Sequence, residues 1–301
     1  MLGTLIILAC SETSIVDSQV DLPPERVIVR DGHLNFAPSW HPFEDRFVYL
    51  SRPITAQTPI EGGSSSPISG FGAYTKGLVI KEIEKGSTVS RELVFDSTGV
   101  NFVSYSPDGA SLLFCSCRNG SADVYSLHIE SGRLQRRSQE IGDESHPCWS
   151  PSGDRFAYIS NGILVISGDS PIYYTDLPVT ISAICWADDG ESLLMFASIK
   201  GEQSLYRFSP AMEQLTQIGA TPFDGLYLDF AEPIFSDGAD IGPQLVYQKK
   251  NSLFVFSFSQ QRSSLVIENG NMPCFSPDGS QVVYSNQGEI IIASIWIGVD
   301  D

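Results

Sequence analysis

Short apolar stretches separated by turn-forming residues run along most of the chain. Residues 163–166 read ILVI and residues 253–256 read LFVF, and each stretch is bounded by Gly, Asn, Ser or Asp. Apolar runs of this length between turn signals are typical of β-strands. The spacing of apolar residues that an amphipathic helix requires is nearly absent. The pattern therefore predicts an all-β protein.

Two of these stretches are almost the same. Residues 103–116 read VSYSPDGASLLFCS, and residues 272–285 read MPCFSPDGSQVVYS. In both, an aromatic residue precedes a Ser-Pro-Asp-Gly turn, where Pro fixes φ, Asp caps the turn and Gly adopts a positive φ. Weaker copies occur elsewhere, which gives six units beginning at Trp40, Tyr105, Trp149, Trp186, Phe235 and Phe275.

Each unit continues with further strand-like segments. In the second unit, the strand after the turn at 106–109 is followed by Val124–Leu127 and then by a more polar segment, Gly132–Gln135. Four antiparallel strands about every 40 residues are typical of a propeller blade, which buries its apolar faces against its neighbours. The sequence thus predicts a six-bladed β-propeller of four-stranded antiparallel blades over residues 26–301. The repeated aromatic residue is expected to pack between blades.

The last unit ends after its third strand. The segment Arg26–Arg30 reads RVIVR and is placed to supply the missing outer strand. Such pairing would close the ring between the two ends of the chain and remove exposed sheet edges.

The aromatic-Ser-Pro-Asp-Gly turn followed by an apolar strand resembles the repeat of the TolB-type β-propeller family. The resemblance covers roughly residues 26–301, with intact turns at 106–109 and 276–279. It implies a non-catalytic scaffold that binds an envelope protein partner in the bacterial periplasm, as a monomeric propeller. TolB proteins also carry an N-terminal α/β domain, which does not fit into the residues before Arg26, so functions of that domain are not transferred.

The N-terminus reads MLGTLIILAC. Residues Ile7–Cys10 resemble the bacterial lipobox, which implies a signal segment over 1–10, lipidation at Cys10 and a tether over 11–25. The protein would then be exported and anchored to the outer membrane through that lipid. No Lys or Arg precedes the apolar run, which departs from the usual pattern, and the alternative is a plain apolar N-terminus.

A long insertion lies between the second and third strands of the first unit. Residues 53–76 are rich in Gly, Ser and Pro. The segment is either a surface loop or a loop that contacts a partner. In the second case its apolar residues would make the contact: Ile60, Ile68, Phe71 and Tyr74.

Charge excludes some partners. The chain has 18 Lys and Arg against 36 Asp and Glu, for a net charge of -18. Such a surface repels a phosphate backbone, so nucleic acid is not an expected partner. An anionic membrane would not be held by charge, which leaves Cys10 as the expected membrane contact.

Polar residues recur near the start of the inner strands, where they are expected to gather at one mouth of the central channel. They are either a hydrated funnel or a site for a divalent cation or a peptide end. Sugar lyases with related propellers use several histidines and a metal in such a channel, whereas only His146 lies at this level here. A ligand-binding or lyase-like propeller is therefore the alternative function. The candidate residues are Asn35, Asn101, Glu144, His146, Ser182, Asp229, Glu232 and Asn271.

No catalytic signature stands out. The chain has no G-x-S-x-G motif, phosphate loop or dinucleotide fingerprint, so no enzyme activity and no cofactor are expected. Cys148, Cys185 and Cys274 precede the repeated aromatic, where other units have Ser39, Ser104 or Ile234. We interpret this position as a small buried slot, whose thiols lie on different blades and are not expected to form disulfides.

Overall fold

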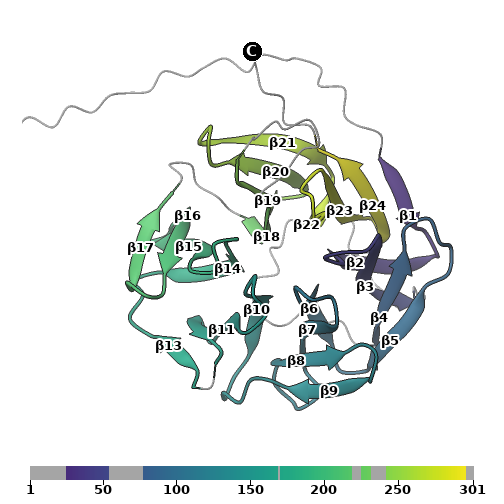
Figure 1. Cartoon of the computed structure of the whole chain (residues 1–301), viewed down its shortest axis with the longest axis horizontal. Coiled ribbons are helices and arrows are strands. Elements are labelled where there is room, and N and C mark those ends of the chain that lie inside the picture. The colour runs from purple at the N-terminus through teal and green to yellow at the C-terminus, as the bar shows by residue number, and fades with distance from the viewer. Residues whose placement is uncertain (1–24, 54–76, 169, 219–224, 232–241, 296–301) are drawn as a thin grey trace, which may run out of the picture.

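Six small sheets surround a common axis (Figure 1). The computed structural model describes residues 25–53, 77–168, 170–218, 225–231 and 242–295. Each sheet has four antiparallel strands, so the predicted six-bladed β-propeller is confirmed. The described residues include no helix that is long and apolar enough to span a bilayer.

The first three blades follow one another along the chain, each from the axis outward. Blade 1 consists of β2 (His33–Trp40), β3 (Arg46–Pro53), β4 (Leu78–Glu84) and β5 (Arg91–Asp96). Blade 2 consists of β6 (Val100–Tyr105), β7 (Ser111–Ser116), β8 (Asp123–His128) and β9 (Arg133–Arg136). Blade 3 consists of β10 (Glu144–Trp149), β11 (Phe156–Ser160), β12 (Ile163–Ile166) and β13 (Ile172–Tyr174).

The remaining blades repeat this order. Blade 4 consists of β14 (Thr180–Trp186), β15 (Leu193–Ile199), β16 (Glu202–Ser209) and β17 (Gln214–Gln217). Blade 5 consists of β18 (Gly225–Ala231), β19 (Gln244–Lys249), β20 (Ser252–Ser257) and β21 (Arg262–Glu268). Blade 6 consists of β22 (Asn271–Phe275), β23 (Gln281–Asn286), β24 (Glu289–Ser294) and, as its outer strand, β1 (Arg26–Val29).

The ends of the described chain meet in blade 6. Strand β1 pairs antiparallel with β24, with Val27 opposite Ile291, and Figure 1 shows the two strands side by side. The Arg30 side chain adds an ion pair to Glu289 just beyond the strand. The expected closure of the ring by the N-terminal strand is therefore confirmed.

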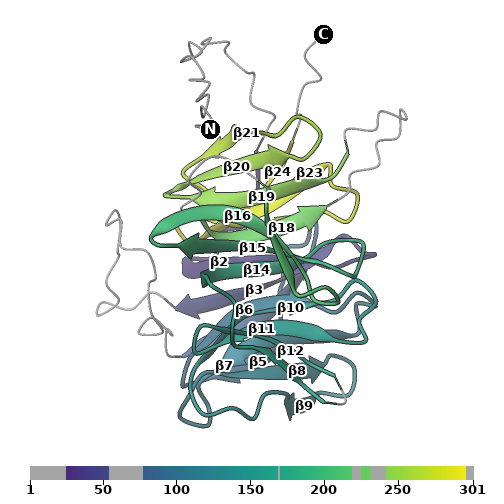
Figure 2. The same ribbon diagram turned by 90° about the vertical axis from the view of Figure 1, so that its left-hand side faces the viewer.

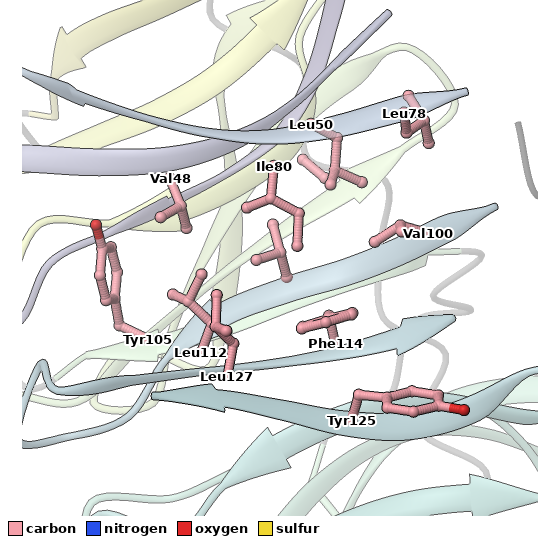
Figure 3. Packing of buried hydrophobic residues seen from close by; sticks show 12 residues of the cluster. Val48, Leu50, Leu78, Ile80, Val100, Tyr105, Leu112, Phe114, Tyr125 and Leu127 are labelled. Atoms are coloured by element: carbon pink, nitrogen blue, oxygen red, sulfur yellow. The ribbon is translucent and has the colours of Figure 1, made fainter. Parts of the chain in front are cut away.

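The repeated aromatic residues pack against the preceding blade. Trp186 of blade 4 joins an apolar cluster with Ala157 and Ile159 of blade 3. Tyr105 of blade 2 lies in the cluster formed with Val48 and Leu50 of blade 1 (Figure 3). These contacts make the apolar clusters span the seams between neighbouring blades.

The expected alignment of blade 5 is wrong. Asp229 pairs with Val246 and Phe230 with Leu245, as Cys274 and Phe275 pair with Val283 and Val282 in blade 6. The repeat positions of blade 5 are therefore Asp229 and Phe230, and Ile234 and Phe235 come after the strand. The sequence FSDG at 235–238 has the composition of the repeat turn, but it follows β18 by several residues and lies outside the described residues.

Candidate functional site

A cavity of about 510 Å³ occupies the axis of the propeller. All six inner strands contribute to its walls, together with the turns that follow five of them. Its residues fall into three levels, which are the strand bulges, the slot residues before the aromatics, and the turns. Figure 2 shows the disc from the side, with the strands stacked around this axis.

The level farthest from the turns is formed by bulges in the inner strands. The ladder between the first two strands is interrupted three residues before the aromatic, and Ala37, Phe102, His146 and Met272 adopt positive φ there. Bulges of this kind re-aim the residues that follow them. The His146 ring lies against Phe102, with 4.2 Å between ring centroids, and both residues line the cavity.

One slot residue from each blade forms the middle level. The Trp40 backbone N–H of blade 1 donates to Cys274 Sγ of blade 6 at 3.4 Å, and the Phe275 N–H of blade 6 donates to Asp229 Oδ2 of blade 5 at 2.8 Å. In blades 5 and 6 the slot side chain thus accepts a hydrogen bond from the next blade. The slot residues are small side chains that carry an oxygen or a sulfur atom: Ser39, Ser104, Cys148, Cys185, Asp229 and Cys274.

The three slot thiols are neutral. Burial raises the pKa of Cys148 to about 12, and it raises the pKa values of Cys185 and Cys274 well above the usual thiol value. The Asp229 carboxylate contributes in the same direction at each of the three thiols, which places it within electrostatic reach of all of them. The five cysteines within the described ranges form no disulfide.

Turns from adjacent blades interlock to form the third level. Four turn prolines line the cavity, namely Pro42, Pro107, Pro151 and Pro277, and Asp188 takes this place in blade 4. We call these five residues the collar. Glycine leaves room for the neighbouring turn to approach. At Gly109, for example, a Cβ would lie 2.4 Å from His41 Nε2 of blade 1.

The cavity carries negative charge on one side. Asp188 and Asp229 belong to the adjacent blades 4 and 5, and among the described lining residues there is no Lys or Arg. His146 is the one imidazole in that lining. The remaining walls are mainly prolines, aromatic rings and small side chains, so the cavity is largely apolar with two carboxylates at different depths.

The structure places the eight candidate channel residues in different settings. Only His146 and Asp229 belong to the cavity lining, and Glu232 lies outside the described residues. The other five hold adjacent segments: Asn35 Nδ2 donates to Gly288 O, Asn101 Oδ1 accepts from the Phe102 N–H, Ser182 Oγ donates to Phe196 O, Asn271 Oδ1 accepts from Gln248 Nε2, and Glu144 joins blades 2 and 3.

Glu144 is fully buried between these blades. Ser138 Oγ of the link between the blades donates to Glu144 Oε2 at 3.0 Å, and Ser160 Oγ donates to Oε1 at 3.2 Å. Burial nevertheless raises the pKa of Glu144 to about 7, and the Asp123 and Glu140 carboxylates add to the effect. The side chain is therefore a buried acid in the seam between blades 2 and 3.

Several expected sites cannot be placed. Cys10 and the insertion residues Ile60, Ile68, Phe71 and Tyr74 lie outside the described residues. The insertion does connect β3 to β4, the second and third strands of blade 1, as expected. Across the part of the chain that the structure describes, no three His, Cys, Asp or Glu side chains gather closely enough to hold a metal ion.

Sequence reasoning missed the common role of the slot. A signal was present, because Pro-Ser/Cys-aromatic recurs at 38–40, 147–149 and 273–275. The misaligned fifth unit put Ile234 in this position and hid that all six residues there carry an oxygen or sulfur atom. With Asp229 in its place, the slot accepts an inter-blade N–H bond in blades 5 and 6, whereas Ser104 Oγ of blade 2 is buried without a hydrogen-bond partner among the described residues.

Known proteins share the architecture. No protein-family model matches the chain. A putative TolB from Agrobacterium tumefaciens has a TM-score of 0.64 at 13% identity, covering 90% of this chain and 94% of that one. An oligogalacturonate lyase from Vibrio parahaemolyticus has a TM-score of 0.54 at 12% identity, covering 94% and 96%.

One curated relative is similar in sequence. The uncharacterized peptidase YuxL of Bacillus subtilis is 26% identical in an alignment over 197 residues that covers 60% of this chain and 28% of that protein. The chain thus spans less than a third of the relative's length. At these identities the comparisons show a fold, and the chain is a six-bladed propeller similar to those of TolB-like proteins and oligogalacturonate lyases.

Proposed function

We propose that the protein is a non-catalytic scaffold of the bacterial cell envelope that binds another envelope protein. One observation carries the proposal: the chain forms a closed disc, and nearly all of it aligns with nearly all of a putative TolB. A ring of sheets joined at its ends is a rigid platform for loops. The neutral thiols and proline walls of the cavity offer no activated nucleophile, which favours binding over catalysis.

The insertion at 53–76 is the proposed partner loop. Strand β3 runs away from the collar, so the β3–β4 connection starts and ends on the opposite face of the disc. Apolar side chains in an otherwise Gly- and Ser-rich segment suit contact with a partner. In this proposal Ile60, Ile68, Phe71 and Tyr74 supply that contact.

Affinity purification from native envelope extracts tests this role. We expect the wild-type chain to recover a defined envelope protein, and we expect a chain in which the four apolar residues are replaced by Ser to lose it. A matched control replaces four Ser or Thr residues of the same segment by Ala and keeps the partner. Equal recovery by all three chains would remove the loop from the proposal, and recovery of no envelope protein would overturn the scaffold role itself.

Anchoring at Cys10 is part of the same proposal. A lipid on this cysteine would hold the propeller at the outer membrane from the periplasmic side. Fractionation of cells expressing wild type and Cys10→Ser is the test. We expect wild type in the outer membrane and the variant in the soluble periplasmic fraction, whereas the same fractionation of both would contradict lipid anchoring.

A ligand-binding or lyase-like propeller is the second candidate. It is favoured by the presence of His146 and Asp229 in one cavity. The metal content of the purified protein separates the two candidates. One cation per chain that is lost in His146→Ala would favour the second, and a metal content that His146→Ala does not change would favour the scaffold.

A further inference from the structure

We propose that the axial cavity binds an organic cation, a ligand that joins an ammonium group to an apolar body. This inference goes beyond the scaffold role and does not depend on a protein partner. It rests on the charge, the walls and the size of the cavity. Each of these features comes from described residues.

The charge of the cavity is negative at two depths. Asp229 lies at the level of the slot residues, and Asp188 lies in the collar of the neighbouring blade. A cation passing the collar would meet first one carboxylate and then the other. Because the whole chain carries a net charge of -18, the field outside the cavity also attracts cations.

Nearby guanidinium groups are held outside this lining. Arg207 pairs with Asp189, the neighbour of Asp188, at 3.4 Å. Arg155 lies over the Trp186 ring and donates to Gly190 O at 2.9 Å. Neither of these two Arg residues is among the described residues that line the cavity.

The walls suit the apolar body of such a ligand. Proline rings form most of the collar, and Phe102, Met272 and five of the repeated aromatic residues also line the cavity. The slot thiols are protonated, so they add polarizable surface without adding charge. A volume of about 510 Å³ is in the range of small-molecule sites, which are mostly apolar with a few placed polar groups.

Direct titration by calorimetry tests the proposal with three probes of the same shape. They are cyclohexylmethylamine, which is a cation at neutral pH, the neutral cyclohexylmethanol, and the anion cyclohexanecarboxylate. We expect one saturable site for the amine, with affinity at least about tenfold above that of the alcohol, and no detectable binding of the anion. No saturable site for the amine, or equal affinity for amine and alcohol, would overturn the proposal.

Variants then identify the carboxylates. Asp229→Asn keeps an acceptor for the Phe275 N–H, and Asp188→Asn changes an exposed turn residue. We expect each to weaken amine binding about tenfold or more. The matched control is Glu191→Gln, which removes one charge from the same turn as Asp188 but does not line the cavity, and should leave binding unchanged.

These variants still test the proposal if one of them fails to fold. Should Asp229→Asn lack the circular dichroism of wild type, the comparison of Asp188→Asn with Glu191→Gln carries the test. Equal amine affinity of the folded Asp variants and Glu191→Gln would show that these carboxylates do not hold the cation, and the proposal would be wrong.

Discussion

At the scale of single residues, two neighbouring positions of the inner strand contact the adjacent blades. The aromatic residue packs on the blade before it, as Trp186 does on blade 3, and in blades 5 and 6 the slot residue accepts a hydrogen bond from the blade after it, as Cys274 does from Trp40. Their side chains point in opposite directions because successive side chains of a strand alternate. The repeat is therefore preserved by inter-blade contacts, and its recurrence needs no catalytic role.

Glu144 makes the stability of the blade 2–3 seam depend on pH. Its pKa rises from 4.5 to about 7 on folding, so the native state binds more protons than the unfolded state between these values. The contribution of Glu144 to the free energy of unfolding is therefore greatest below about pH 4.5 and falls by about 3 kcal/mol as the pH rises through 7. Glu144→Gln should remove that fall.

Urea unfolding at about pH 5 and pH 8 measures the effect. We expect wild type to lose stability relative to Glu144→Gln as the pH rises. Glu191→Gln, an exposed carboxylate without a buried environment, serves as the control and should follow wild type. Parallel pH profiles for wild type and Glu144→Gln would show that the buried acid does not titrate in this range.

Two features of the structure favour glycine at position 109: its positive φ and the close approach of the His41 side chain. Gly109 has a φ of +72°, and a Cβ would lie 2.4 Å from His41 Nε2. Gly132 has a similar φ of +66°, but a Cβ there would meet nothing within 4 Å. We expect Gly132→Ala to cost about 1 kcal/mol of unfolding free energy, and Gly109→Ala to cost about 2 kcal/mol more because of overpacking.

A double-mutant cycle with His41→Ala separates the two causes. Removing the imidazole should reduce the cost of Gly109→Ala to that of Gly132→Ala. An unchanged cost in the His41→Ala background would mean that the turns of blades 1 and 2 do not interlock as described.

At the scale of elements, the N-terminal strand is the part of the fold that covers an edge. Val29 is buried in a cluster with Trp40 of blade 1 and Ile290 of blade 6, so β1 joins the first and last blades. A chain that begins at residue 31 should lose several degrees in Tm and show fast amide exchange along β24. A chain that begins at residue 25 keeps β1 and should behave as the full chain.

Hydrogen exchange read by mass spectrometry distinguishes these chains. The expected difference is confined first to β24, whose outer hydrogen bonds go to β1. Equal protection of β24 in both chains would show that the strand does not close blade 6.

Strands were predicted more accurately in units where the sequence repeat is regular. The strand Ile163–Ile166 was predicted with its observed bounds, and the closing strand was placed correctly, because turn residues bound each of them. Blade 5 was misaligned, since the FSDG at 235–238 has the same turn chemistry as the repeat and drew the alignment away from Phe230. Only the pairing of Asp229 with Val246 settles that alignment.

At the scale of the whole molecule, polarity along the chain predicted a channel but not the residues that line it. Five of the candidate channel residues hold hairpins and seams instead, as Asn271 does with Gln248. Side-chain direction at a bulge follows from backbone geometry that local sequence does not reveal. The collar was likewise hidden, because its prolines were interpreted as turn formers and not as a wall of the cavity.

The central claim is that the chain closes on itself, since closure defines both the axis and the cavity. In Arg30→Lys, a carbodiimide can join the new amine to Glu289, the residue that Arg30 pairs with across β1 and β24. Lys85 and Asp45, 3.3 Å apart within blade 1, provide an internal positive control. We predict that mass spectrometry of the monomer finds both cross-links. The Lys85–Asp45 cross-link without the one between residues 30 and 289 would contradict the closed ring.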